Sequence, residues 1–240
     1  MRWLTGLGSV RAATYGEVVT GTPAEVLVAA MRPRLRGWLH TIIAPVALVS
    51  GIVLVVLAPT RAAAVAAAAF GVPAVALFTT SAIYHRGVWS PRVEQLLKRL
   101  DHANIFLLIA GSYTPFAVLA LRDDVRIAVL AAVWGTAIAG VVFRVLWVDA
   151  PRWLYTALYL GLGWAASFVV PQLLHGTGAA VFTLVAVGGA AYTVGGVVYG
   201  LRRPDPWPRW FGFHEIFHSL TIVGFVCQYV AASMLVYRAV

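Results

Sequence analysis

Long apolar stretches separated by short polar ones dominate the pattern of the chain. Seven stretches are about 20 residues long, the length that an α-helix needs to cross the hydrocarbon core of a bilayer. The alternating pattern of β-barrel strands is absent, so helices must satisfy the backbone hydrogen bonds in lipid. The predicted spans are Gly37–Leu57, Ala62–Tyr84, Asp101–Leu121, Ile127–Trp147, Trp153–Leu174, Ala179–Gly200 and Phe213–Tyr237.

The connections between the predicted spans are short, so we expect residues 37–240 to form one bundle with antiparallel neighbours. Residues 1–36 are a basic lead-in. Within it, Thr22, Pro23 and Glu25 have the order of a helix start, which predicts a short helix over Pro23–Met31 along the membrane interface. The alternative is a polar tail with no role beyond setting the topology.

The composition agrees with an integral membrane protein of the all-α class. The chain has 240 residues, 61% hydrophobic and 11% charged, whereas soluble domains carry about 25% charged residues. The net charge of +9 does not indicate nucleic-acid binding, because the basic residues lie between apolar segments and form no stripe. The single cysteine, Cys227, excludes an internal disulfide and a cysteine-based metal cluster.

The distribution of arginine and lysine predicts the orientation of the bundle. Fourteen of the 18 basic residues lie in the N-terminal segment or in the loops after spans two, four and six. Cytoplasmic loops carry the excess of positive charge in membrane proteins. The sequence therefore predicts a cytoplasmic N-terminus, an external C-terminus and a multi-pass protein of the cell membrane.

Several polar residues in the predicted spans point to a metal site. His214 and His218 are four residues apart, so both imidazoles lie on one helix face and can bind one Zn²⁺ ion. His85 ends span two, and Asp101 begins span three. The predicted topology puts these groups at one depth near the cytoplasmic face, where Ser81 shares the face of His85.

Each of these residues also has a simpler interpretation. A histidine at an interface is often an amphipathic anchor, Asp101 is in the position of an N-cap, and Ser81 can bond to its own helix. We interpret His40 as interfacial, expect His102 to face a neighbouring helix or the headgroups, and expect Arg144 to extend to the headgroups.

His214-Glu215-Ile216-Phe217-His218 also matches the H-E-x-x-H motif of zinc proteases. Glu215 is adjacent to His214, so it projects away from the line that joins the two histidines. After it the chain has no aspartate or glutamate to serve as a third ligand. A third ligand must therefore come from another helix. His85 fits this role, which favours a three-histidine site over the ligand set of a zinc protease.

The motifs together resemble the hemolysin III family, which is related to the progestin and adiponectin receptors and more widely to alkaline ceramidases. The segments that carry the resemblance are Ser81–His85, Leu100–His102, Gly111–Phe116, His214–His218 and Arg36–His40. The resemblance runs from about Arg32 to the C-terminus. It implies seven helices, a zinc ion held by His85, His214 and His218, with Ser81 and Asp101 near the metal-bound water, and a bacterial inner membrane location.

These expectations lead to three functional hypotheses. The first is a zinc-dependent hydrolase of membrane lipid amides or esters, in which Asp101 accepts the proton of a water and Ser81 orients that water or stabilises the oxyanion. The second is a non-enzymatic receptor or membrane-state sensor with structural zinc. The third is a hemolysin-type pore or membrane-perturbing protein. Membrane lipids are the expected partners, and the sequence identifies no protein partner.

Overall fold

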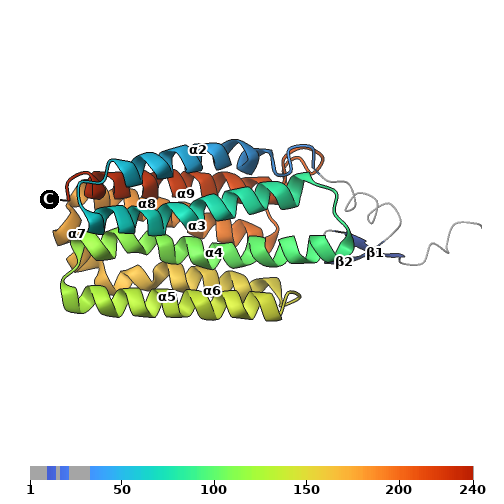
Figure 1. Ribbon diagram of the computed structural model, residues 1–240. Helices are drawn as coiled ribbons and strands as arrows, with labels where there is room; N and C mark the ends of the chain where they lie inside the picture. Colours follow the sequence, from blue (N-terminus) through green and yellow to red (C-terminus); the bar gives the residue numbers. More distant parts are fainter. Residues whose placement is uncertain (1–9, 15–16, 22–32, 240) are drawn as a thin grey trace, which may run out of the picture.

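The computed structural model describes residues 10–14, 17–21 and 33–239, and long helices running side by side dominate it (Figure 1). Seven spans in this part of the chain are long and apolar enough to cross a membrane, with α6 to α7 counted as one. This confirms the predicted seven-span, all-α architecture. The helices are α2 (Trp38–Val56), α3 (Arg61–Arg86), α4 (Pro91–Ala120), α5 (Asp123–Leu146), α6 (Arg152–Trp164), η1 (Ala165–Val169), α7 (Val170–Thr177), α8 (Ala179–Leu201) and α9 (Phe213–Val236).

The lead-in contains a small antiparallel hairpin that the sequence pattern did not predict. Strand β1 (Val10–Thr14) pairs with β2 (Glu17–Gly21) along their whole length. The helix predicted over Pro23–Met31 lies outside the described residues.

The third span begins earlier than predicted. Helix α4 starts at Pro91, with Ser90 at its N-cap position, so its first ten residues precede the apolar stretch. Proline suits the first helical turn because its missing N–H has no partner there. Asp101 therefore lies inside a helix, and the interpretation of Asp101 as an N-cap is wrong. The hydropathy pattern failed here because polar residues continue the helix beyond the apolar part.

The fifth span is broken, where we expected one continuous helix. α6 ends at Trp164, and η1 connects it to α7, which has Pro171 in its first turn. A side chain from α4 satisfies backbone groups at the break: the Tyr113 hydroxyl donates to the carbonyl of Gly163 at 2.6 Å and accepts from the amide of Ala166 at 2.7 Å. A break inside a membrane needs such replacement partners.

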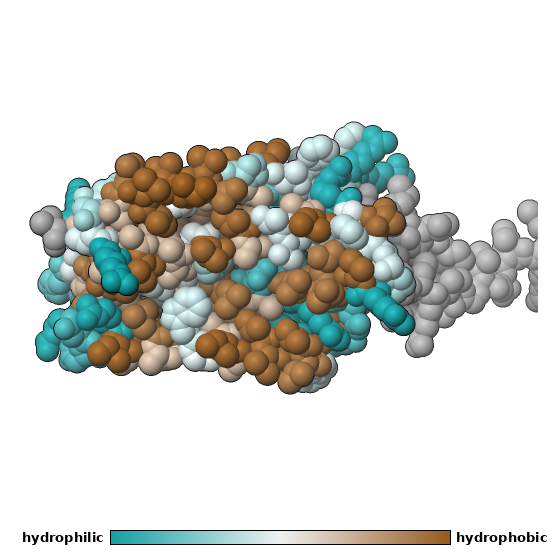
Figure 2. All heavy atoms as spheres, in the orientation of Figure 1, coloured by the Kyte–Doolittle hydropathy of each residue, from teal (hydrophilic) through white to brown (hydrophobic). Residues whose placement is uncertain are grey.

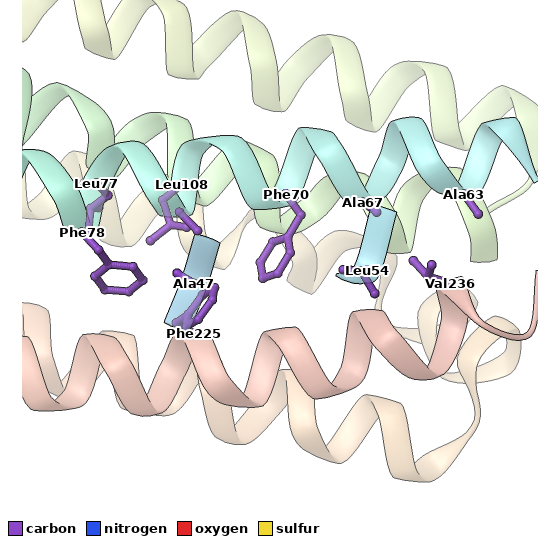
Figure 3. Close-up of a cluster of buried hydrophobic side chains, with 11 residues drawn as sticks. Ala47, Leu54, Ala63, Ala67, Phe70, Leu77, Phe78, Leu108, Phe225 and Val236 are labelled. Carbon is purple, nitrogen blue, oxygen red and sulfur yellow. The ribbon is translucent and has the colours of Figure 1, made fainter. Parts of the chain in front are cut away.

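The packed core lies between α2, α3, α4 and α9 (Figure 3). Phe70 of α3 stacks on Phe225 of α9, Phe78 of α3 meets the same ring edge-on, and Leu54 of α2 is fully buried in the same cluster. Close helix approach is possible because Gly111 of α4 has no side chain. A Cβ atom there would lie 2.6 Å from a carbonyl oxygen of α3.

The surface agrees with a lipid environment. Hydrophobic side chains are exposed along the flank of the bundle, and hydrophilic ones gather towards its two ends (Figure 2). On α2, Ile42, Val49 and Ile52 are more than half exposed. We call the end where α2, α4 and α9 begin and α3 ends the histidine end. Its assignment to the cytoplasm stays a prediction.

Candidate metal centre

Three histidines converge at the histidine end. His85 lies in the last turn of α3, and His214 and His218 lie one turn apart at the start of α9. One ring nitrogen of each histidine lies within 4.8 Å of the others, and the Nε2 atoms of His85 and His214 are 3.2 Å apart. His85 and His218 are buried. The structure thus brings together the three predicted ligands as a triad that could hold a metal ion.

Ser81 and Asp101 complete the predicted group. Ser81 lies one turn before His85 on α3 and is buried, and its hydroxyl donates a hydrogen bond to the carboxylate of Asp101. The Oδ2 atom of Asp101 is 3.8 Å from Nε2 of His85, and the side chain of Asp101 is 13% exposed. A carboxylate held by a hydroxyl at the edge of the triad is in a position to take a proton from a water there.

Glu215 does not take part in the triad, which agrees with the rejection of the protease motif. Its Oε2 atom accepts the amide hydrogen of Gly212 at 2.9 Å and so caps the start of α9. Its Oε1 atom forms an ion pair with Nε of Arg36 at 2.6 Å. With both oxygens engaged in this way, the carboxylate holds the helix start that presents His214 and His218.

The segment before α2 crosses the histidine end next to the triad. The amides of Arg34 and Leu35 donate to the carbonyls of Arg209 and Trp210 in the connection between α8 and α9. Gly37 then adopts a positive φ of 79°. A Cβ atom at Gly37 would lie 2.8 Å from Cβ of His85, so this glycine allows the chain to pass directly over a triad residue.

His40 is a fourth histidine at the site, and the interfacial interpretation of it is wrong. Its ring is 2% exposed and stacks on His218, with ring centroids 3.7 Å apart and an interplanar angle of 12°. Among the described residues, neither ring nitrogen of His40 has a hydrogen-bond partner. Its only sequence signal was its place in the first turn of an apolar span, which is equally typical of an interfacial anchor.

A second buried polar cluster lies beside the triad. It corrects the prediction for Arg144, whereas His102 faces neighbouring helices, the first of its two predicted alternatives. Arg144 does not extend to the headgroups: it is fully buried, and its Nη2 atom is 3.0 Å from Nδ1 of His102. His102 is also buried, and its Nε2 atom is 3.2 Å from the hydroxyl of Tyr199. Tyr155 lies under the guanidinium of Arg144 and is 3.3 Å from the hydroxyl of Tyr199. We call these four residues the Arg144 network.

Burial of the Arg144 charge is possible because the guanidinium finds acceptors inside the bundle. Nη1 donates to the carbonyl of Trp147 at 3.0 Å, and Nη2 donates to that of Val148 at 3.1 Å. α5 ends at Leu146, so these carbonyls belong to the chain just beyond the helix and turn back towards the side chain. No motif in the sequence predicts this turn.

A cavity of about 350 Å³ opens at the triad and runs along the inside of the bundle. Ser81, Asp101 and His218 line its polar end, and its walls beyond the triad are mainly apolar, reaching Leu121 and Leu173 near the other end of the helices. This volume is in the range of sites that enclose small ligands, about 300–1,000 Å³. The cavity thus has a polar end at the triad and a mainly apolar remainder.

Comparison with known proteins agrees with the geometry. The model of the family described as "Haemolysin-III related" matches residues 28–229. The chain is 32% identical over 155 residues to the hemolysin-3 homolog of Bacillus subtilis (strain 168), covering 65% of this chain and 70% of that protein. It is 32% identical over 165 residues to hemolysin-3 of Bacillus cereus, covering 69% and 72%.

A eukaryotic relative is similar over a comparable length. The chain is 33% identical over 166 residues to the heptahelical transmembrane protein ADIPOR2 of Oryza sativa subsp. japonica, covering 61% of this chain and 70% of that protein. The word heptahelical in that name agrees with the seven spans found in the described residues.

Proposed function

Because the chain belongs to the haemolysin-III related family of multi-pass membrane proteins, and because its fold brings three imidazoles together at the polar end of a mainly apolar cavity, we propose that it is a zinc-dependent hydrolase of membrane lipid amides or esters. The convergence of the triad with Ser81 and Asp101 at the polar end of this cavity carries the proposal.

The donor set fits a zinc ion. Two nitrogen ligands of a tetrahedral Zn²⁺ ion at about 2.0–2.1 Å lie about 3.3–3.4 Å apart, and the Nε2 atoms of His85 and His214 are 3.2 Å apart. Among the described residues, only the three histidines of the triad meet in this mutual arrangement. Three protein ligands are typical of catalytic zinc sites, whereas structural sites have four.

Zinc held by neutral imidazoles supplies Lewis acidity and acidifies a water molecule. Two residues of this chain then handle the proton of that water. Asp101 accepts a proton at its carboxylate, and the hydroxyl of Ser81, which donates to that carboxylate, fixes its direction. In this arrangement Ser81 acts through Asp101 by orienting its carboxylate. The same hydroxyl could also act directly, by orienting the water or stabilising the oxyanion.

The cavity supports a lipid as the substrate. Its apolar walls would enclose an acyl chain and keep bulk water from the site, while the head group lies at the triad. The connection formed by Arg34 and Leu35 with the loop before α9 covers the histidine end, which favours entry of the substrate from the membrane.

The two alternative functions have less support. A receptor or sensor with structural zinc would be expected to close the site with a fourth protein ligand. A pore would be expected to have a polar, hydrated lumen, whereas the walls of this cavity beyond the triad are mainly apolar.

The test combines metal content with lipid hydrolysis. We expect about one zinc per chain in detergent-purified wild-type protein and none in His214→Ala/His218→Ala, measured by mass spectrometry. We expect wild-type protein to cleave one class in a panel of ceramides, other lipid amides and phospholipid esters. Asp101→Asn should keep its zinc and lose activity by roughly 10²–10⁴-fold.

Asp149→Asn is the matched control, because its carboxylate is 76% exposed and lies outside the triad. It should retain wild-type activity. A wild-type protein without metal, or an Asp101→Asn variant as active as the wild type, would refute the assignment.

A further inference from the structure

Tyr199 connects the Arg144 network to the cavity. It lines the cavity, as His102 does, whereas Arg144 and Tyr155 do not. Its ring packs edge-on against His214, with centroids 5.7 Å apart, and against Phe217 at 4.9 Å. Tyr199 therefore stands next to a triad residue but is held from behind by a cluster outside the triad.

The hydrogen-bond directions in the network follow from the chemistry of its members. A guanidinium has only donors, so Nδ1 of His102 accepts from Nη2 of Arg144 at 3.0 Å. The proton of neutral His102 is then on Nε2, which donates to the oxygen of Tyr199 at 3.2 Å. Arg144 thus fixes the tautomer of His102, and His102 makes the Tyr199 oxygen an acceptor.

The remaining contact leaves the hydrogen of Tyr199 available. The Tyr155 and Tyr199 hydroxyls are 3.3 Å apart, which is long for two hydroxyls, and Tyr155 has no other hydrogen bond recorded in the described part of the chain. If Tyr155 donates, both lone pairs of the Tyr199 oxygen are engaged. The hydroxyl hydrogen of Tyr199 can then turn towards the cavity.

The ring of Tyr199 lies against a different residue of the triad than the predicted catalytic pair does. Asp101 of α4 lies against His85, and Tyr199 of α8 lies against His214. A lipid head at the triad would therefore meet a proton-accepting carboxylate from one helix and a hydrogen-bond donor from another.

We infer that the Tyr199 hydroxyl donates a hydrogen bond to a carbonyl oxygen of the bound lipid, in a direction set by His102 and Arg144. The inference takes the class of ligand, a membrane lipid, from the proposed function. It adds a preference among ligands of that class. The site prefers an amphiphile with a hydrogen-bond acceptor level with the triad. Tyr199 is the contact residue, and His102 and Arg144 are positioning residues.

The experiment measures binding without hydrolysis. 2-Tetradecanone carries a carbonyl that cannot be hydrolysed, and tetradecane is the same chain without it. Each would displace the fluorescent probe 11-(dansylamino)undecanoic acid from detergent-purified protein. We expect wild-type protein to bind the ketone about twofold to tenfold more tightly than the alkane, the range of one neutral hydrogen bond.

Two tyrosine variants locate the donor. Tyr199→Phe keeps the ring against His214 and removes the hydroxyl, so the difference between ketone and alkane should disappear while zinc content stays unchanged. Tyr155→Phe, the matched control, removes a hydroxyl of the same network that does not line the cavity. It leaves Tyr199 its hydrogen and removes the neighbouring oxygen that could compete for it, so the difference should remain. A difference that survives in Tyr199→Phe, or one that is absent from wild type, would overturn the inference.

A second pair of variants tests the positioning role and stands even if Tyr199→Phe does not fold. His102→Gln keeps an N–H donor near the position of Nε2 and should retain the preference for the ketone. His102→Leu removes the donor and should weaken it. Equal preference in the two variants would contradict the role of His102. The outcome is separable from the proposed function, because ketone selectivity without any lipid hydrolysis rejects only the hydrolase.

Discussion

The triad and the Arg144 network are neighbouring buried polar clusters with different patterns of hydrogen bonds. In the Arg144 network, both ring nitrogens of His102 face protein partners, and the guanidinium also bonds to two backbone carbonyls. In the triad, the Nε2 atoms of His85 and His214 face each other at 3.2 Å. Without an ion, one of these two neutral imidazoles donates its hydrogen and the other accepts it, so the contact pairs the two histidines with each other.

The difference separates a cluster fixed by several protein partners from a cluster of histidines that could hold an ion. Polar groups buried in a folded protein are nearly always paired, and those left over need an explanation such as an ion. Most polar side-chain atoms of the Arg144 network meet this requirement with fixed protein partners, and Nε of Arg144 is the exception among the described residues. In the triad, the same ring nitrogens that pair with each other could instead bind one ion, because they converge within 4.8 Å.

The largest expected effect comes from breaking the network that is already paired. Arg144→Leu would leave Nδ1 of His102 and the carbonyls of Trp147 and Val148 without their donor. Leaving one buried polar group unpaired costs about 1–3 kcal/mol, so we expect a loss of about 3–5 kcal/mol in the free energy of unfolding. Chemical unfolding in detergent would measure it.

Arg122→Leu is the matched control for Arg144. Its side chain is 81% exposed and forms only a long contact to Asp124 at 3.6 Å. Exposed ion pairs contribute about 0–1 kcal/mol. Equal losses in the two arginine variants would mean that the buried network does not stabilise the fold.

The second effect concerns the metal. Removing it with a chelator should destabilise wild-type protein by about 3 kcal/mol if the buffer had held free zinc at about 100 times the dissociation constant. His85→Ala should lose this response and unfold at the same temperature with or without chelator. A chelator effect of wild-type size in His85→Ala would remove that histidine from the proposed ligand set.

Much of the site was predictable because the residue spacing and the order of the spans determine which side chains lie close together. His214 and His218 share a helix face by their separation of four residues, and the alternation of spans brings His85 to the same end. Neither inference needs the details of side-chain packing. The ends of the spans could also be predicted from the sequence where the apolar stretch and the helix coincide, as in α2, α8 and α9.

The rest depended on partners that are distant in the sequence. The burial of Arg144 requires His102, which lies 42 positions away on another helix. The break after Trp164 depends on the hydroxyl of Tyr113 from α4. The stacking of His40 on His218 joins the first and last spans. Hydrophobic periodicity within one segment carries no information about such pairs.

The third effect is a steric disturbance of the triad from outside it. Gly37→Ala would place a side chain at a φ of 79° and a Cβ atom 2.8 Å from Cβ of His85. The left-handed conformation alone costs about 1–2 kcal/mol for a residue with a side chain. We expect that loss of stability together with weaker zinc affinity, measured by competition with a chromophoric chelator.

Gly135→Ala in α5 serves as the control for Gly37, because nothing lies within 4 Å of the Cβ atom that it would gain. Alanine favours the helix interior over glycine by about 0.5–1 kcal/mol, so this variant should be neutral or more stable. Unchanged zinc affinity in Gly37→Ala would show that the segment before α2 does not constrain His85.

The smallest expected effect is at His40, and it tests which cluster this histidine resembles. His40→Phe keeps an aromatic ring on His218 and against Phe78, and removes two ring nitrogens that have no partner among the described residues. Replacing unpaired polar atoms by an apolar ring of similar shape is close to neutral. We therefore expect the unfolding free energy to change by less than about 1 kcal/mol and the zinc content to stay the same. His102→Phe, by contrast, breaks two hydrogen bonds and should clearly lower the unfolding free energy. A large loss in His40→Phe would mean that its nitrogens are paired in the working protein, which would add His40 to the ligand-binding cluster of the triad.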